Sequence, residues 1–294
     1  MSQTDITVVL TVYNQDLSSI ETSMNSIAAQ IDCSYQLIVA DDHSSQNMEE
    51  KVTRLASSLE IERFSYIRHP ENVQTVRNIL FALPFAEGRY TKAMGSGDEL
   101  YDNHVLADIV EFCDVNDVEA GFGGITLDTA NGPLYDAPKK ASAYNLESVC
   151  SGTDQLHLQL LNADWIPAGC QFFKTEKLAS LLSELSSSFH IRYCEDFAQT
   201  ICLPDTKPIH MNRPVLVYEW GTGVSNRGSR SSRKRLYADH NSLYRTFSER
   251  YPDDEIIAKS YRIFKLREFA ALKTPLYPLL QKLSLRSYTR DQNR

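Results

Sequence analysis

The chain has 294 residues, of which 42% are hydrophobic and 23% are charged, so it is long enough for one large domain or two smaller ones. This composition excludes wholesale disorder. A formal net charge of -8 argues against bulk nucleic acid as the main partner. The charge is unevenly spread, because residues 226–294 hold 16 basic and 7 acidic side chains while residues 1–225 are strongly acidic.

The cysteines and the apolar runs indicate the cellular compartment in which the protein is expected. Six cysteines are scattered without a C-x-x-C pair or a metal-ligand spacing, so no disulfide framework is expected: Cys33, Cys113, Cys150, Cys170, Cys194 and Cys202. The first residues have no basic region followed by an apolar core, and no apolar run approaches the roughly 20 residues that cross a bilayer. We therefore expect a cytoplasmic protein that is neither a secreted precursor nor an integral membrane protein.

Short β-rich runs alternate with amphipathic helical patterns over the first hundred residues. Four strands are predicted, at Ile6–Val12, Tyr35–Ala40, Phe64–Ile67 and Arg89–Met94. Ser18 with Glu21 forms a possible capping box for the first helix, and Asn72 can cap the helix that precedes the fourth strand. This alternation is typical of a doubly wound parallel sheet with right-handed crossovers.

The pattern loosens into a mixed α+β second half. Helices are predicted over residues 153–162, 175–187, 195–202, 236–250, 253–273 and 276–288, with an extended stretch at 208–219. The segment Gly221–Arg235 is polar, basic and rich in Gly and Ser, which favours a mobile loop. The helices after it carry basic and apolar side chains together, so they predict either a basic amphipathic surface or helices packed on the rest of the protein.

Polar residues follow the strands where ligands bind in open α/β sheets. The first strand ends in T-V-Y-N from Thr11, the second in D-D-H-S-S from Asp41, and the fourth in G-S-G-D-E from Gly95, while Arg77 lies on the helix after the third. There is no P-loop and no G-x-G-x-x-G after the first strand. A diphosphate would then need a carboxylate-bound divalent cation or an arginine.

Four runs occur in order and at suitable spacing over roughly the first 105 residues: V-V-L-T-V-Y-N, L-I-V-A-D-D-H-S-S, N-V-Q-T-V-R-N and M-G-S-G-D-E-L. Together they resemble the nucleotide-sugar-binding half of inverting glycosyltransferases of family 2. The resemblance implies an α/β, GT-A-like fold, with a mixed, mainly parallel sheet flanked by helices and a C-terminal helical extension. It implies a catalytic domain over 1–220, divided into a nucleotide-binding half (1–105) and an acceptor half (106–220), followed by the basic loop and C-terminal helices of 221–294.

The resemblance also assigns roles in the first half. It places Thr11 beside the nucleobase, with Tyr13 in the same donor-binding run, and it gives Asp41 a hydrogen bond to the uracil ring or its equivalent. It gives Arg77 a contact to the nucleotide or diphosphate. The metal motif of the family is D-x-D or D-D; here Asp98 matches the acid that holds the cation, whereas Gly97 stands where a companion acid is expected. Glu99 could partly compensate.

In the second half, Glu195–Asp196 resembles the E-D pair that supplies the general base, with Asp196 preferred and Glu195 in reserve. The run from Trp165 to Phe173 resembles the stretch that lines the donor-sugar and acceptor pocket. Taken alone, these acids could instead be helix N-terminal residues that favour the macrodipole. By the same standard, Asp41 could be an ordinary turn acid and Arg77 a surface residue.

The function expected from these residues is metal-assisted sugar transfer with inversion, from a nucleotide diphosphate sugar, with a UDP-sugar as first choice and Mg²⁺ or Mn²⁺ as cofactor. A saccharide or a lipid-linked saccharide is the expected acceptor, as in O-antigen or capsule synthesis. The C-terminal basic helices offer a peripheral contact at the inner face of the membrane. Alternatives are a nucleotide-sugar-binding or scaffold protein without catalysis, motivated by Gly97, and a nucleotidyltransferase, which ranks third.

Overall fold

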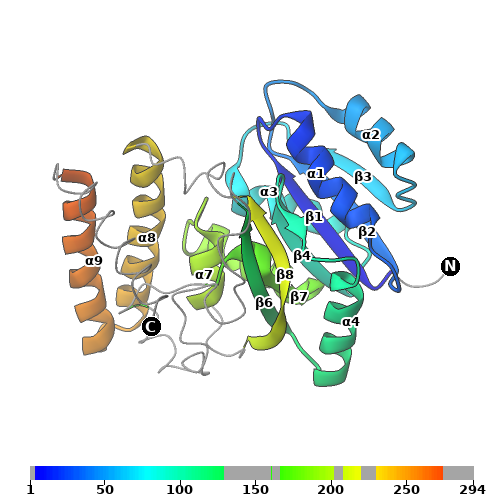
Figure 1. The fold of residues 1–294 in the computed structure, drawn as a ribbon. Helices are drawn as coiled ribbons and strands as arrows, with labels where there is room; N and C mark the ends of the chain where they lie inside the picture. Colours follow the sequence, from blue (N-terminus) through cyan, green and yellow to red (C-terminus); the bar gives the residue numbers. More distant parts are fainter. Residues whose placement is uncertain (1–3, 129–159, 161–165, 202–207, 220–229, 274–294) are drawn as a thin grey trace.

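The computed structural model describes residues 4–128, 160, 166–201, 208–219 and 230–273 (Figure 1). The strands are β1 (Ile6–Val12), β2 (Tyr35–Asp41), β3 (Phe64–Arg68), β4 (Tyr90–Gly95), β5 (Glu99–Leu100), β6 (Ala120–Asp128), β7 (Gln171–Lys174) and β8 (Ile209–Glu219). The helices are α1 (Leu17–Ala28), α2 (Glu49–Ser58), α3 (Gln74–Ala82), η1 (Leu83–Phe85), α4 (Val105–Asn116), η3 (Ala168–Cys170), α6 (Thr175–Ser187), α7 (Glu195–Ile201), α8 (Arg230–Arg250) and α9 (Glu255–Lys273).

The strands form one mixed sheet in the order β3-β2-β1-β4-β7-β6-β8-β5. Strands β3, β2, β1 and β4 are parallel, β7 is antiparallel to both β4 and β6, β6 is parallel to β8, and β5 is antiparallel to β8. The expected mixed, mainly parallel α/β sheet with C-terminal helices is confirmed. The chain moves from β1 to β2 and β3 on one side and returns to β4 on the other, so the strand order reverses between β1 and β4. Ligands bind at such a reversal in open α/β sheets.

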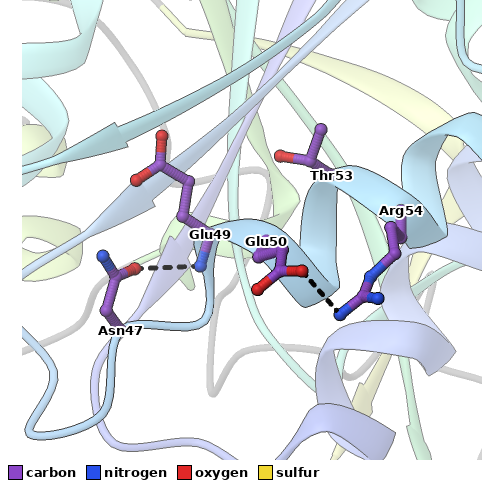
Figure 2. Close-up of a pocket in the computed structure, with 5 residues that line it drawn as sticks. All are labelled: Asn47, Glu49, Glu50, Thr53 and Arg54. Carbon is purple, nitrogen blue, oxygen red and sulfur yellow. Dashed lines mark hydrogen bonds and ion pairs between the residues drawn. The ribbon is translucent and has the colours of Figure 1, made fainter.

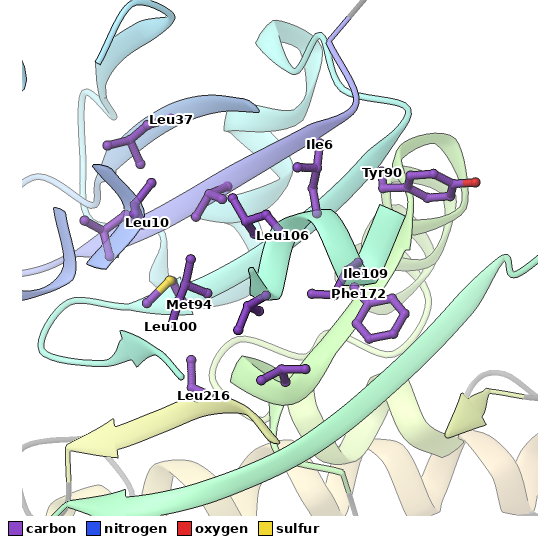
Figure 3. Close-up of a cluster of buried hydrophobic side chains, with 14 of the residues drawn as sticks. Ile6, Leu10, Leu37, Tyr90, Met94, Leu100, Leu106, Ile109, Phe172 and Leu216 are labelled. Carbon is purple, nitrogen blue, oxygen red and sulfur yellow. The ribbon is translucent and has the colours of Figure 1, made fainter. Parts of the chain in front are cut away.

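Alternating side chains of the central strands feed two cores. Val8 and Leu10 of β1 join a first cluster with α1, α2 and α4, whereas Val9 joins a second cluster with α3, α6 and α7. This follows from the period-two geometry of a strand, which sends neighbouring side chains to opposite faces of the sheet. Figure 3 shows part of the first cluster, including Leu106 of α4 beside the strands. Helices therefore cover both faces of the sheet, so the ends of its strands remain the places where a ligand can bind.

The C-terminal helices pack into the second core. Leu243 and Tyr244 of α8 and Phe264 of α9 are buried there, and the Tyr244 and Phe264 rings stack with centroids 4.8 Å apart. Because α8 begins at Arg230, the expected mobile loop over Gly221–Arg235 is wrong from residue 230 onward, and 221–229 lie outside the described residues. The helix starts early because Leu236 and Tyr237 already pack against this core. Of the two expectations for these helices, packing on the rest of the protein is the one observed, on the faces that contact the second core.

Two expected helix caps are replaced by others. Asp16, not the Ser18–Glu21 pair, caps α1, because its Oδ1 accepts from Ser19 N at 2.9 Å. At α3 the expected cap by Asn72 is wrong, since the Asn72 amide donates to the Asp42 carbonyl instead. The Asp42 carboxylate takes that place, accepting from the first backbone N–H groups of the helix. The Asp42 side chain, directly after β2, thus fixes the start of α3, which is the second helix after that strand.

Other predictions lie outside the described residues. These are the helix over 153–162, apart from Leu160, and the helix over 276–288. Within the part of the chain that the structure describes, no helix has both the length and the apolar character needed to span a bilayer.

Removing a buried ring from the first core should measure how much that core stabilises the fold. Phe172 is fully buried and meets Phe112 edge-on. We expect Phe172→Ala to lower the free energy of unfolding by about 3–5 kcal/mol, because it leaves a cavity. Phe85, which is 53% exposed, is the matched control, and Phe85→Ala should change stability by only about 0.5 kcal/mol. If urea denaturation showed equal losses of unfolding free energy in the two variants, this assignment of the core would be contradicted.

Candidate functional site

The turn after β4 lies at the reversal of strand order. Thr11 of β1 pairs with Gly95 of β4, and the Ser96 N–H continues this contact by donating to the Thr11 carbonyl at 3.2 Å. From α1, the Ser23 hydroxyl accepts from Gly97 N at 2.9 Å and donates to the Asp98 carbonyl at 2.7 Å. Gly97 has φ +99°, in the range that favours glycine. The structure therefore brings Thr11, Gly97 and Asp98 together, as the sequence predicts.

Asp98 is almost completely enclosed at this turn. It is 7% exposed, and its Oδ1 accepts from Glu219 N at 3.0 Å. Burial raises the pKa of Asp98 to about 7, although this hydrogen bond and the charge of Lys92 act in the opposite direction. A carboxylate in this environment favours a nearby positive charge.

Lys92 is a buried cation that the sequence analysis missed. It is fully buried in β4, and its Nζ donates to the Gly169 carbonyl of η3. Burial lowers the pKa of Lys92 to about 8, while the charges of Cys170 and Asp98 oppose that shift. Lysines are almost never fully buried without a partner, so a lysine within the strand run Y-T-K-A-M-G was the available signal.

The loops after β1 and β2 are tied to each other. Asn14 N donates to Ser44 Oγ at 2.9 Å, and Asn14 Oδ1 accepts from Ser45 N at 2.8 Å. Beneath them Asp41 is fully buried, and its carboxylate accepts from Ser44 N, Tyr66 Oη and Arg68 Nε. A direct contact between Asp41 and a nucleobase would require these bonds to be exchanged. Tyr13, which directly precedes Asn14 in the sequence, is 49% exposed.

Arg77 lies apart from this network. Its side chain is exposed on α3, and its Nε donates to Ser186 Oγ of α6 at 3.1 Å. None of the hydrogen bonds or ion pairs found in the described part of the chain joins Arg77 to Asp98. The expected diphosphate contact would need the arginine to leave Ser186, and it stays a prediction.

A second acidic site opens α7. Glu195 and Asp196 are the first two residues of this helix, and Asp196 Oδ1 accepts from Phe197 N at 2.7 Å. Burial raises the pKa of Asp196 to about 6. Burial and the charge of Asp196 raise the pKa of Glu195 well above its usual range, and its Oε2 is buried with no hydrogen-bond partner in the described structure. With a pKa of about 6, Asp196 can be deprotonated at neutral pH and can act as a base.

Asp239 of α8 holds the chain that leads into this pair. Its Oδ2 accepts from three consecutive backbone N–H groups, those of Arg192, Tyr193 and Cys194, at 2.9, 2.6 and 3.1 Å. The Arg192 carbonyl in turn accepts from Val76 N near the start of α3. Nothing in the sequence around Asp239 points to this role, because the partners lie more than 40 residues away.

The short helix η3 connects the two acidic sites. It contacts β4 and β8, which carry the turn at Asp98 and its partner Glu219, and it also contacts α7, which carries Glu195 and Asp196. A Cβ added at Gly169 would lie 3.7 Å from Asp98 Oδ2, so the backbone of η3 runs directly beside that carboxylate. The predicted pocket-lining run ends in this helix and β7, although Trp165 lies outside the described residues.

A surface pocket elsewhere is separate from these groups. Figure 2 shows it at the start of α2, where Asn47 accepts from Glu49 N and Glu50 forms an ion pair with Arg54. Its lining shares no residue with the two acidic sites. No group of three or more His, Cys, Asp or Glu side chains suited to a metal ion occurs among the residues that the structure describes.

Comparisons with known proteins agree with this arrangement. The family model for glycosyl transferase family 2 matches residues 7–182, which is more than half of the chain. A comparison with curated protein sequences finds no match.

Solved structures share the fold over nearly the whole chain. Residues 1–349 of S. aureus TarS in complex with UDP-GlcNAc are 15% identical, with 97% of this chain and 78% of that one covered and a TM-score of 0.62. The mannosyltransferase PcManGT from Pyrobaculum calidifontis, in complex with GDP-Man and Mn²⁺, is 18% identical, with coverage of 98% and 76% and a TM-score of 0.55. At these identities the likeness shows the fold alone.

The role of Asp239 can be tested by its effect on local order. We expect Asp239→Ala to destabilise the protein by about 1–3 kcal/mol, because three backbone N–H groups, one buried and two partly buried, lose their acceptor. Amide hydrogen exchange should speed up at residues 192–194. Asp239→Asn should lose less stability, since an amide oxygen can still accept hydrogen bonds. Asp253→Ala, at an exposed position, is the control. Unchanged exchange at 192–194 in Asp239→Ala would refute the assignment.

Proposed function

The chain belongs to glycosyl transferase family 2, and we propose from this that it transfers a sugar, with inversion, from a nucleotide diphosphate sugar to a saccharide or lipid-linked saccharide. A UDP-sugar is the donor that we propose first. The observation that carries the proposal is the pairing of two acidic sites through η3. Asp98 lies at the strand reversal where a donor binds, and Asp196 lies at the start of α7 with a pKa of about 6.

The turn at Asp98 suits a divalent cation. Its donors are carboxylate oxygens, which Mg²⁺ and Mn²⁺ prefer, and the buried Ser96 hydroxyl in the same turn has no hydrogen-bond partner in the described structure. The chemistry supplied by a bound Mg²⁺ or Mn²⁺ is stabilisation of the charge that develops on the departing diphosphate. Asp98 would hold that ion, with Lys92 behind it adding a fixed positive charge. The Mn²⁺ in the PcManGT complex supports a metal requirement.

Asp196 is the proposed general base. It would take the proton from an acceptor hydroxyl while that oxygen attacks the anomeric carbon from the face opposite the diphosphate. One displacement of this kind inverts the anomeric centre and needs no covalent enzyme intermediate. Burial and the charge of Asp196 raise the pKa of Glu195 and so favour its neutral form, which would leave the base role to its neighbour.

The proposal divides the chain as the sequence suggests. Residues 1–105 would bind the nucleotide, with Thr11, Tyr13, Asp41 and Arg77 on the donor side. Residues 106–220 would bind the acceptor, and 221–294 would form the basic segment and the C-terminal helices. Surface-polysaccharide synthesis in the cytoplasm, with the basic C-terminal helices at the inner face of the membrane, is the setting that we propose. The net charge of +9 over residues 226–294 supports that contact.

A panel of UDP-, GDP- and dTDP-sugars with Mn²⁺ or EDTA tests the donor site. We expect one nucleotide class to stabilise the protein in thermal shift and to release nucleoside diphosphate slowly, with both effects dependent on the metal. Asp98→Ala should lose both, because the cation loses its carboxylate. Binding without turnover, even with saccharide acceptors present, would favour the inactive binding protein. No binding by any class would refute the donor site.

The base is tested by pH and by a matched pair of variants. We expect transfer to rise with pH up to about 6 and then level off, because Asp196 must lose its proton to act. Asp196→Asn should lower turnover by about 10²-fold or more without weakening UDP binding. Glu195→Gln, which mimics a protonated carboxyl group, should be much milder. A variant Asp196→Asn with wild-type turnover would exclude this residue as the base.

A further inference from the structure

The space beside Gly97 is filled by a carboxylate from another strand. A Cβ built at position 97 would lie 2.8 Å from the carboxyl carbon of Glu219 and 3.5 Å from its Cβ, with Oε2 closer still. A side chain at Gly97 would therefore start in the volume that the Glu219 side chain occupies. The acid that is missing from the turn in the sequence has a counterpart there in space.

Strand β8 holds Glu219 in this place through its backbone. Glu219 N donates to Asp98 Oδ1 at 3.0 Å, across 121 positions of the chain. Two residues earlier, Val217 pairs with Glu99 in the antiparallel β5–β8 ladder, and Glu219 itself pairs with Asp128 of β6. Because β8 is fixed on both sides, the Glu219 side chain is delivered to the same turn as Asp98.

We propose that Glu219 is the second carboxylate of the divalent-cation site, acting with Asp98 in place of the acid absent at Gly97. The inference rests on the proposed function, since the cation would bridge these two side chains to the diphosphate of the donor. Mg²⁺-type sites commonly use one or two carboxylates together with substrate phosphates. A pair of acids is thus a sufficient protein contribution, in keeping with the lack of a larger ligand group among the described residues.

The charges around the turn support this pairing. Asp98 and Glu219 bring two carboxylates to one turn, where their negative charges repel each other. A divalent cation would offset those charges, and the Ser96 hydroxyl, buried in the same turn without a partner in the described structure, is a further hard oxygen.

The experiment measures binding of Mn²⁺ itself by electron paramagnetic resonance of the full-length protein, with and without UDP. Glu219→Gln keeps the size of the side chain and the backbone N–H that bonds Asp98, so it removes only the charge. We expect it to weaken Mn²⁺ binding at least about tenfold, as should Asp98→Asn. Glu99→Gln tests the neighbouring acid of the turn as the alternative second carboxylate, and the exposed Glu49→Gln at the start of α2 is the control, which should bind Mn²⁺ like the wild type. Thermal unfolding of each variant verifies folding.

Glu219→Asp is a second variant, which keeps the charge on a shorter side chain and should bind Mn²⁺ better than Glu219→Gln. Wild-type Mn²⁺ binding by folded Glu219→Gln, or weakened binding in Glu99→Gln alone, would overturn the inference. UDP binding measured without metal tests the donor site independently of the proposal that Glu219 holds the cation. If the wild type binds no nucleotide, the donor site fails, while the Mn²⁺ titrations still report on Glu219.

Discussion

The burial of Asp98 is the constraint around which the candidate site is organised. An ionised carboxylate inside a protein is unfavourable unless hydrogen bonds and opposite charge compensate it. Here Glu219 N supplies the hydrogen bond and Lys92 the charge. Lys92 would be equally unfavourable alone, so the two ions and the Gly169 carbonyl stabilise one another. The backbone of residues 95 and 169 runs beside the carboxylate. These contacts hold the turn in one arrangement, the one in which we propose that a cation and a diphosphate bind.

The proposed donor side and the proposed base are joined by a chain of hydrogen bonds in which backbone N–H groups donate to two carboxylates and one carbonyl. Asp42, at the end of β2, accepts from the first N–H groups of α3. Val76 of α3 donates to Arg192, and Asp239 of α8 binds the N–H groups of residues 192–194 just before Asp196. Helices from both halves of the protein thereby fix the position of one carboxylate. The C-terminal helix α8 belongs to the site as much as the sheet does.

Local patterns were sufficient to predict the strands of the first half, although not its helix caps. The apolar alternation of β1 and β2 and the polar strand ends follow from short-range rules, and the structure brings Thr11, Gly97 and Asp98 together as expected. The residues that were missed act at long range. Glu219 and Asp239 contact partners 121 and more than 40 positions away, so no window of sequence contains both members of either pair. The early start of α8 was missed for the same reason, because Leu236 and Tyr237 find their core in distant helices.

The glycine at 97 then has a physical explanation that a motif alone does not provide. Its φ of +99° suits a residue without a side chain, and the Glu219 side chain occupies the volume that a side chain there would enter. An acid at position 97 and Glu219 in its present position would exclude each other. Loss of the motif acid and delivery of an acid by β8 are therefore two aspects of one arrangement. A departure from a family motif reads as loss of function only when the space beside it is empty, and here that space contains a carboxylate.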